Sequence, residues 1–214
     1  MKRINKFWLP DSDRHFISHF EQYNGFQLER LEVALRYVKN WGMAIDGGAH
    51  VGSWAKKMGE QFGRVYAFEP AEDTFECLAR NVWADRHIHA VNAALGDQAG
   101  FVNIAWEEKH RVSGNTGARY VHYDRDGEVQ AVTIDSFNFK DVGLIKLDVE
   151  GAELLALKGA HDTIMKYKPV IFIEVKKGFA ERFDSDMQAP IRYLKELGAH
   201  EATHIKADHI FVFD

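Results

Sequence analysis

Short apolar runs alternate with stretches of helical periodicity along most of the chain. Apolar residues at helical spacing predict helices over 26–42, 52–62, 72–83, 152–167 and 187–198. Short apolar runs predict strands over 43–46, 64–69, 88–95, 101–106, 143–149, 169–175 and 209–214. Strands that alternate with helices are typical of an α/β protein with a doubly wound, mostly parallel sheet and helices on both faces.

Polar side chains stand at the ends of the predicted strands. There are five of them: Asp46, Glu69, Asn92, Asp148 and Glu174. Ligands of doubly wound sheets bind beyond the carboxyl ends of the strands, at the point where the strand order reverses. Because four of the five side chains are acids that would repel one another, the crevice favours a cationic or hydroxyl-rich ligand.

The segment AIDGGAHVGSWAKKMG, residues 44–59, leads from a strand into a helix through a tight turn. Chains bend in this way where the backbone must approach a nucleotide-like cofactor closely. A dinucleotide fingerprint requires G-x-G-x-x-G, but Ala49 stands where the second glycine is needed. The turn therefore argues against a dinucleotide.

The same turn fits S-adenosylmethionine better. The pattern for that cofactor is an acid followed by alternate glycines, and here Asp46, Gly48 and Gly52 follow it. His50 takes the place of the middle glycine, where it is expected to be a turn residue, with a role as a base as the alternative. Glu69 follows 23 residues after Asp46, where a carboxylate can accept hydrogen bonds from both ribose hydroxyls of a nucleoside.

Five segments, in order, resemble the FkbM family of S-adenosylmethionine-dependent methyltransferases: AIDGGAHVGSWA, VYAFEP, VNAALGD, AVTIDSF and LIKLDVEGAELLALKGA. DVEGAE is the most specific part, because α/β architecture does not demand it. The resemblance implies a class I methyltransferase fold with a seven-stranded sheet, and O-methylation of a small molecule or sugar. It covers about residues 43–175, so we expect a methyltransferase domain over 41–214 behind an N-terminal helical cap or extension over 1–40.

The resemblance also implies a cofactor site. Its expected members are Asp46, Gly48, His50, Gly52, Glu69, Asn92, Ala93 and Asp148. The turn that begins at Asp46 would flank the methionine part of the cofactor. Glu69 would hold the ribose, and residues 92–95 would contact the adenine.

Three residues near the end of the strand 143–149 are candidates for the chemistry. Methyl transfer from a sulfonium is an in-line displacement, so the acceptor must be aligned and, if it is a hydroxyl, deprotonated. Asp148 is the first choice for contacting the acceptor or its proton. Lys146 shares a strand face with Asp148 and either neutralises the acidic crevice or acts in catalysis. Glu150 either complements the following helix dipole or takes part in catalysis.

A divalent metal is a further possibility at these strand ends. Asp148 and Glu174 should lie on adjacent strands, and such a pair could hold Mg²⁺ against paired hydroxyls of an acceptor. The alternative is that Lys146 already compensates the pair. His15 and His19 are four residues apart, but without an evident third ligand they are expected on an exposed helix face.

Two further segments bear on the acceptor. The polar segment 110–127, which includes Tyr123, would suit a sugar-like acceptor, and a solvated loop is the alternative. Aromatic residues crowd the N-terminus: Phe7, Trp8, Phe16, Phe20, Tyr23 and Phe26. They are expected to pack this segment onto the sheet, with a lid over the acceptor pocket as the alternative.

Charge and composition limit the classes of partner that we expect the chain to bind. The net charge of −5 gives no general attraction to nucleic acid or an anionic membrane. No apolar run approaches a membrane span, and Cys77 is the only cysteine, so we expect a cytoplasmic protein without a disulfide. A small-molecule or glycan acceptor is expected. The alternatives are a nucleic-acid methyltransferase, a non-catalytic S-adenosylmethionine-binding protein and a nicotinamide-dependent oxidoreductase. The sequence does not indicate an oligomeric state.

Overall fold

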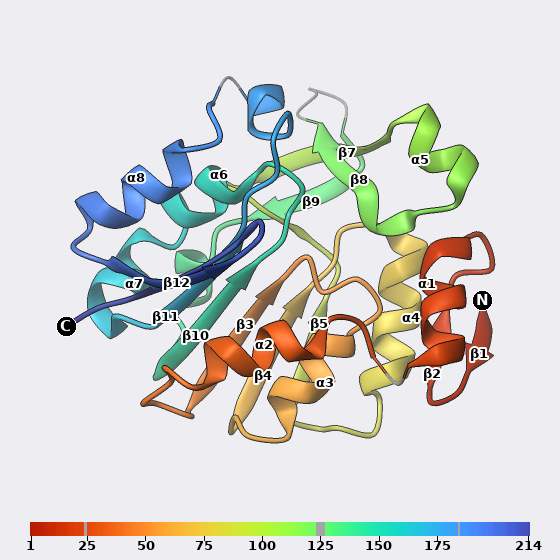
Figure 1. The fold of residues 1–214 in the computed structure, drawn as a ribbon, viewed down its shortest axis with the longest axis horizontal. Coiled ribbons are helices and arrows are strands. Elements are labelled where there is room, and N and C mark those ends of the chain that lie inside the picture. Colours follow the sequence, from red (N-terminus) through yellow and green to blue (C-terminus); the bar gives the residue numbers. More distant parts are fainter. Residues whose placement is uncertain (24, 123–126, 184) are drawn as a thin grey trace.

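A seven-stranded sheet forms the centre of the computed structural model, which describes residues 1–23, 25–122, 127–183 and 185–214 (Figure 1). From edge to edge the strands are β12 (His200–Ile205), β13 (Asp208–Val212), β11 (Val170–Glu174), β10 (Val142–Leu147), β3 (Met43–Gly47), β4 (Arg64–Phe68) and β5 (Ile88–Val91). The strands from β11 to β5 are parallel, and β13 is antiparallel to both its neighbours. The predicted sheet is thus confirmed.

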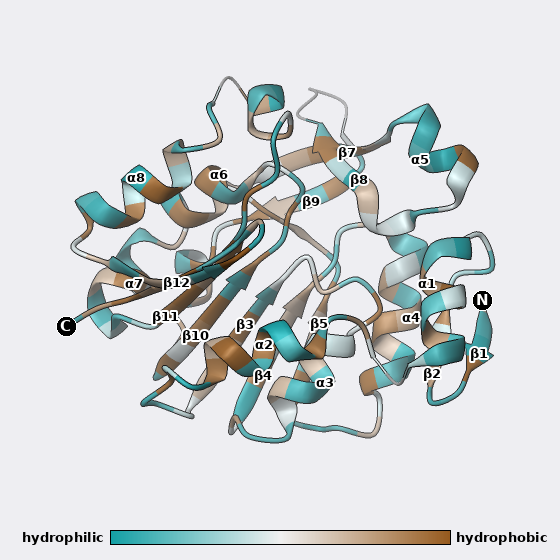
Figure 2. Cartoon of the chain, viewed as in Figure 1, coloured by the Kyte–Doolittle hydropathy of each residue, from teal (hydrophilic) through white to brown (hydrophobic). Residues whose placement is uncertain are grey.

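Helices cover both faces of this sheet, because side chains alternate between the faces along each strand. One face packs against α2 (Leu28–Leu35), α3 (Ser53–Gly59) and α4 (Glu72–Val82). The other packs against α6 (Glu153–Lys158), α7 (His161–Tyr167) and α8 (Ala189–Glu196). Within β10, Leu144 belongs to the first core, and Ile145 and Leu147 belong to the second. Figure 2 shows hydrophobic residues along much of the central strands, and helices in which hydrophobic and hydrophilic residues alternate.

The strand order reverses between β3 and β10. The chain runs from β3 outward through β4 to β5, and it returns to the middle of the sheet at β10. Parallel strands that diverge in this way leave a crevice at their carboxyl ends, which is where ligands of doubly wound sheets bind.

A second sheet of four strands lies beside the first. Its order is β6 (Ala94–Leu95), β9 (Val129–Val132), β7 (Gly100–Trp106) and β8 (Arg119–His122). The expected strand 101–106 is confirmed as β7. The expectation of a loop over 110–127 is wrong in part, because this segment contains the end of α5 (Glu108–Ser113) and all of β8, which pairs with β7. Residues 123–126, and with them Tyr123, lie outside the described residues.

Two elements predicted as continuous are divided. The strand predicted over 88–95 divides into β5 and β6, and β6 pairs with β9 in the second sheet. The helix predicted over 152–167 divides into α6 and α7 near Gly159. The chain there lies so close to the Gly96 carbonyl that a Cβ on Gly159 would be 2.0 Å from its oxygen. Contacts between distant backbones, which periodicity does not reveal, account for this break.

The first 22 residues form a hairpin and a helix that pack beside α4 (Figure 1). The elements are β1 (Lys2–Ile4), β2 (Phe7–Leu9) and α1 (Arg14–Gln22), and the Asp13 side chain caps α1 by accepting from the Phe16 amide at 2.8 Å. Phe7, Phe16 and Phe20 pack with the buried Cys77. Among the described helices, none combines the length and the apolar character that crossing a membrane requires.

Candidate active site

A cavity of about 270 Å³ opens where the strand order reverses, at the carboxyl ends of β3, β4, β10 and β11. Five of the expected cofactor residues line it: Gly48, His50, Glu69, Ala93 and Asp148. So do Lys146, Glu150 and Glu174. Three expected cofactor residues are not among the described lining residues: Asp46, Gly52 and Asn92.

The turn after β3 is shaped by close backbone contacts. The Gly48 and Ala49 amides donate to the Phe68 carbonyl at 3.0 and 2.9 Å, which ties the turn to the end of β4. Gly48 has a φ of +73°, and a Cβ there would lie 1.9 Å from the Asp148 carbonyl oxygen. Position 48 must therefore be glycine, because a side chain there would prevent the turn from packing against the end of β10.

Lys146 and Asp46 form a buried ion pair beneath this turn. They are register partners on β10 and β3, and Lys146 Nζ lies 2.9 Å from Asp46 Oδ1. Lys146 Nζ also donates to the Gly47 and Gly48 carbonyls at 3.0 and 2.8 Å. Burial alone would lower the pKa of Lys146, but the carboxylates of Asp46 and Asp148 reverse this effect and raise it. These contacts favour the interpretation in which Lys146 neutralises the crevice.

Glu69 is held firmly at the end of β4. Its Oε1 accepts from the Ala71 amide at 3.0 Å and from the Thr74 hydroxyl at 2.8 Å, and its Oε2 accepts from the His50 amide at 2.9 Å. The Asn92 amide nitrogen donates to the Glu69 carbonyl at 2.9 Å. Asn92 thus supports the chain around Glu69 from outside the cavity.

His50 joins three segments that are far apart in the sequence. Its φ of +51° is unusual for a residue other than glycine. Nε2 lies 2.7 Å from the Thr116 hydroxyl and 3.4 Å from Asp13 Oδ2, and Thr116 donates to Asp13. The imidazole packs on Phe16 with ring centroids 4.1 Å apart. We call these four residues the His50 clasp, since they fasten α1 and the segment before β8 to the turn after β3.

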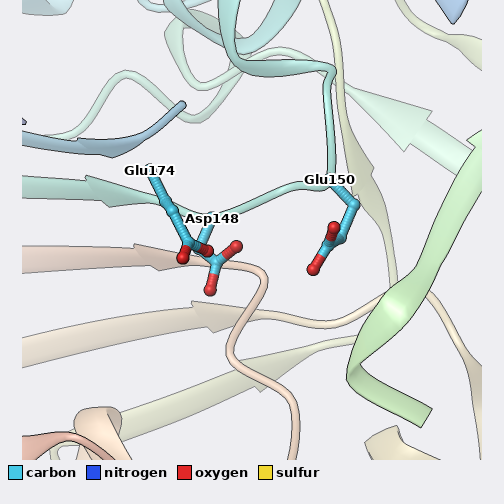
Figure 3. Close-up of side chains that lie close together, drawn as sticks. All are labelled: Asp148, Glu150 and Glu174. Atoms are coloured by element: carbon cyan, nitrogen blue, oxygen red, sulfur yellow. The ribbon is translucent and has the colours of Figure 1, made fainter. Parts of the chain in front are cut away.

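Three carboxyl groups converge at the carboxyl ends of β10 and β11 (Figure 3). Asp148 directly follows β10, and Glu174 is the last residue of β11. Glu150 faces both of them from the turn that leads to α6. Lys176 Nζ lies among them, 2.7 Å from Glu150 Oε1, 2.7 Å from Glu174 Oε2 and 3.6 Å from Asp148 Oδ1. We call these four residues the lysine–carboxylate cluster.

The members of this cluster differ in their charge. The enclosed position of Asp148 opposes ionisation, but the ammonium groups of Lys176 and Lys146 outweigh it and lower the pKa of Asp148 to about 2. Burial and the Asp148 charge raise the pKa of Glu150 to about 7 and that of Glu174 to about 9. At neutral pH Asp148 is therefore ionised, Glu150 is poised between its two states, and Glu174 holds a proton.

A comparison with known families identifies the chain. The model of the Methyltransferase FkbM domain matches residues 46–200, which is most of the sequence. The chain belongs to the FkbM methyltransferase family. A curated relative, Methyltransferase 1 of Beauveria bassiana, is 25% identical in an alignment 148 residues long that covers 55% of this chain and 58% of the relative.

Solved structures agree on the fold. An FkbM methyltransferase from Methylobacillus flagellatus KT is 20% identical, with a TM-score of 0.53 over 99% of this chain and 49% of its own. A Streptococcus mutans protein solved in complex with SAH is 12% identical, with a TM-score of 0.51 over 87% of this chain and 96% of its own. The predicted class I methyltransferase fold is confirmed. The chain spans about half the length of the Methylobacillus protein.

The DVEGAE segment of this FkbM chain owes part of its form to Glu153. The buried Glu153 accepts from the Val149 amide at 3.1 Å and from the Gly151 amide at 3.2 Å. Burial raises the pKa of Glu153 to about 7. The third acid of the segment, Glu153, therefore fixes the turn that carries Glu150 over the cavity.

Gly151→Ala should destabilise the fold by about 2–4 kcal/mol, the sum of a left-handed backbone and overpacking. Gly151 has a φ of +110°, and a Cβ there would lie 2.4 Å from the Phe179 carbonyl oxygen. Urea unfolding measures the loss. Gly100→Ala is the control, because a Cβ at Gly100 meets nothing within 4 Å. Equal stability of the two variants would contradict the prediction.

Both segments that the sequence linked to the acceptor reach the cavity. Asn115, Thr116, Arg119 and Tyr120 line it from the segment 110–127. Phe16 and Phe26 line it from the N-terminal side, with ring centroids 4.4 Å apart, whereas Phe7 and Phe20 lie in the buried cluster beside α4. The N-terminal aromatics thus divide between packing and lining the cavity.

Sequence reasoning missed two charged residues of the cavity lining, Lys176 and Asp208. Asp208 lines the cavity, is wholly buried, and accepts from Arg30 at 2.8 Å. Lys176 follows Glu174 by two residues, so a search of the positions just beyond each strand end would have found it. Asp208 gave no such signal, because it begins a strand, and its place follows from the antiparallel pairing of β13 with β11.

Proposed function

We propose that this chain is an S-adenosylmethionine-dependent methyltransferase that methylates a hydroxyl of a small-molecule or sugar-like acceptor. The proposal rests on one arrangement. Glu69 and the lysine–carboxylate cluster line the same cavity, on either side of the Gly48 turn. One side suits a nucleoside and the other suits a reacting hydroxyl. Membership of the FkbM family and the SAH held by the Streptococcus mutans neighbour support the proposal.

The charges of the cavity fit S-adenosylmethionine. Acidic residues among the described lining are Glu69, Asp148, Glu150, Glu174 and Asp208. The basic ones are Lys146, Lys176 and Arg119, and each is already paired with a carboxylate. A ligand that carries a sulfonium and an ammonium gains from this excess of acids, whereas the diphosphate of a dinucleotide would need free cations.

The cofactor would be held by groups already described. The Glu69 carboxylate can accept from a ribose hydroxyl through Oε2, which has one donor and retains a lone pair, whereas Oε1 already accepts from Ala71 and Thr74. The turn at Gly48 and Ala49 would lie along the methionine part, and Ala93 would contact the adenine. S-adenosylmethionine supplies an electrophilic methyl group on a positively charged sulfur.

The cluster would act on the acceptor. The hydroxyl oxygen forms its bond to the methyl carbon as the carbon–sulfur bond breaks, and the electron pair of that bond goes to sulfur. The hydroxyl proton passes to Glu150, because a pKa of about 7 suits a general base at neutral pH. Asp148, with a pKa of about 2, is too weak a base for this step. Asp148 would instead orient the hydroxyl, and its negative charge would stabilise the positive charge that develops on the hydroxyl oxygen as the new bond forms.

S-adenosylmethionine or SAH should raise the Tm by about 5–10 °C at a concentration a hundredfold above Kd, whereas NAD should not. Differential scanning fluorimetry measures the shift, and equal stabilisation by NAD would refute this cofactor. Radiolabelled methyl transfer into fractionated extracts then tests the activity itself.

Glu69→Ala should weaken the binding of SAH by about 1–3 kcal/mol, because hydrogen bonds to a charged acceptor are lost. Isothermal calorimetry on the folded variant measures the change. Glu76→Ala is the matched control, since Glu76 is exposed on α4, the helix that follows Glu69. A dissociation constant unchanged by Glu69→Ala would remove Glu69 from the cofactor site.

A further inference from the structure

The ammonium of Lys176 occupies the centre of the lysine–carboxylate cluster. It lies 2.7 Å from one oxygen each of Glu150 and Glu174, and 3.6 Å from Asp148. These carboxylates come from the end of β10, the turn that follows it and the end of β11 (Figure 3). A single side chain therefore holds together three separate parts of the site.

The same three carboxylates have the spacing of a divalent-cation site. Each offers one oxygen, and all three oxygens lie within 4.8 Å of one another. Hard cations such as Mg²⁺ and Mn²⁺ take oxygen ligands of this kind. However, an ammonium already lies between the oxygens, and a second cation in the same space would be repelled by it.

Lys176 is also open to the cavity. Its side chain is 33% exposed and belongs to the cavity lining, and its ammonium lies 5.7 Å from the centre of the Phe179 ring. One oxygen of Glu150, Oε2, is buried without a hydrogen-bond partner among the described residues. The cluster thus offers a fixed cation to whatever enters, and one oxygen of Glu150 stays without a partner among the described residues.

We propose that Lys176 is a positioning residue whose ammonium serves as the permanent cation of this site, in the place that a metal would take. It holds Asp148 and Glu150 at a fixed separation, so that one acceptor hydroxyl can meet both. A metal ion would bind two neighbouring hydroxyls of an acceptor, whereas this arrangement suits a single hydroxyl. The part of the proposal that concerns catalysis rests on the proposed methyl transfer, but the part that concerns the cation does not.

Titration with Mn²⁺, followed by electron paramagnetic resonance, tests the cation directly. We expect the unaltered protein to leave Mn²⁺ free and Lys176→Met to acquire a site, because the ammonium that lies among the three carboxyl groups is then removed. Lys177→Met is the matched control, since Lys177 is the exposed neighbour, and it should also leave Mn²⁺ free. The site gained by Lys176→Met should disappear when Asp148→Asn is added.

Two results would overturn the proposal. One is specific binding of Mn²⁺ to the unaltered protein that Asp148→Asn abolishes, because a metal would then displace Lys176. The other is a folded Lys176→Met variant that gains no site. If Lys176→Met does not fold, Lys176→Gln replaces it, and the titration of the unaltered protein remains decisive.

Kinetics test the positioning role. Lys176→Met should lower kcat about 100-fold, the scale of a small misplacement of reacting groups, with little change in the KM for S-adenosylmethionine. Lys176→Arg should recover part of the rate, and a chelator should leave the unaltered enzyme fully active. A kcat unchanged in Lys176→Met would refute the role. If no methyl transfer is found at all, the proposed function fails while the Mn²⁺ titration still decides the cation.

Discussion

Asp148→Asn should slow methyl transfer about 10²–10³-fold, the scale of losing one electrostatic contact to the reacting group, while the fold and most of the affinity for SAH are retained. The substitution keeps the shape of the side chain but removes a negative charge that the structure keeps ionised, since the pKa of Asp148 is about 2. This charge lies at the end of β10, at the cavity wall, and 3.6 Å from Lys176. Single-turnover rates at saturating cofactor measure the loss.

A control and a pH profile separate this role from a general loss of structure. Asp97→Asn changes an exposed aspartate outside the cavity lining and should leave the rate unchanged. Because the pKa of Glu150 is about 7, kcat of the unaltered enzyme should rise as the pH rises through that value, and Glu150→Gln should flatten the rise. If Asp148→Asn turned over at the normal rate, Asp148 would have no part in the chemistry.

Lys146→Met should reduce the free energy of unfolding by about 3–5 kcal/mol, the range for breaking a buried ion pair. Asp46 is wholly buried, and Lys146 is its ion-pair partner at 2.9 Å. The same ammonium satisfies two carbonyls of the Gly48 turn, so the loss is greater than for a surface lysine. Urea unfolding monitored by circular dichroism measures it.

The double variant Lys146→Met/Asp46→Asn should recover much of this loss, because the penalty comes from the charge left unpaired. Lys158→Met, on the exposed side of α6, is the control and should change stability by no more than about 0.5 kcal/mol. A double variant no more stable than Lys146→Met alone would show that the pair is held by something other than charge.

The central sheet and the position of the cavity were predictable because both follow from local patterns. Successive side chains of a strand point to opposite faces of the sheet, so the sequence predicts that Leu144 and Ile145 belong to different cores. The structure places them in different cores. The end of each parallel strand then indicates which polar side chains meet. This is why Asp148 and Glu174 could be expected together without any knowledge of the turns between them.

The rest of the site depends on contacts between distant segments. Asp13, His50 and Thr116 meet only because α1 packs beside α4, and no periodicity in residues 1–22 specifies that docking. Lys176 was missed for a different reason. A lysine just after a strand is ordinary on a solvated surface, and its importance comes from the three carboxylates around it.

The His50 clasp has a consequence for how the binding of two ligands is coupled. The backbone amide of His50 donates to Glu69, and its imidazole contacts Thr116, which lines the cavity from the segment 110–127. One residue thus touches both halves of the cavity, so a ligand that fixes Glu69 also steadies the wall that an acceptor would meet. Linkage is reciprocal, and couplings of this kind change affinity by about 5–150-fold. We therefore expect the acceptor to bind more tightly when the cofactor is present, and the cofactor to bind more tightly by the same factor when the acceptor is present, which calorimetric titration of each ligand with and without the other measures.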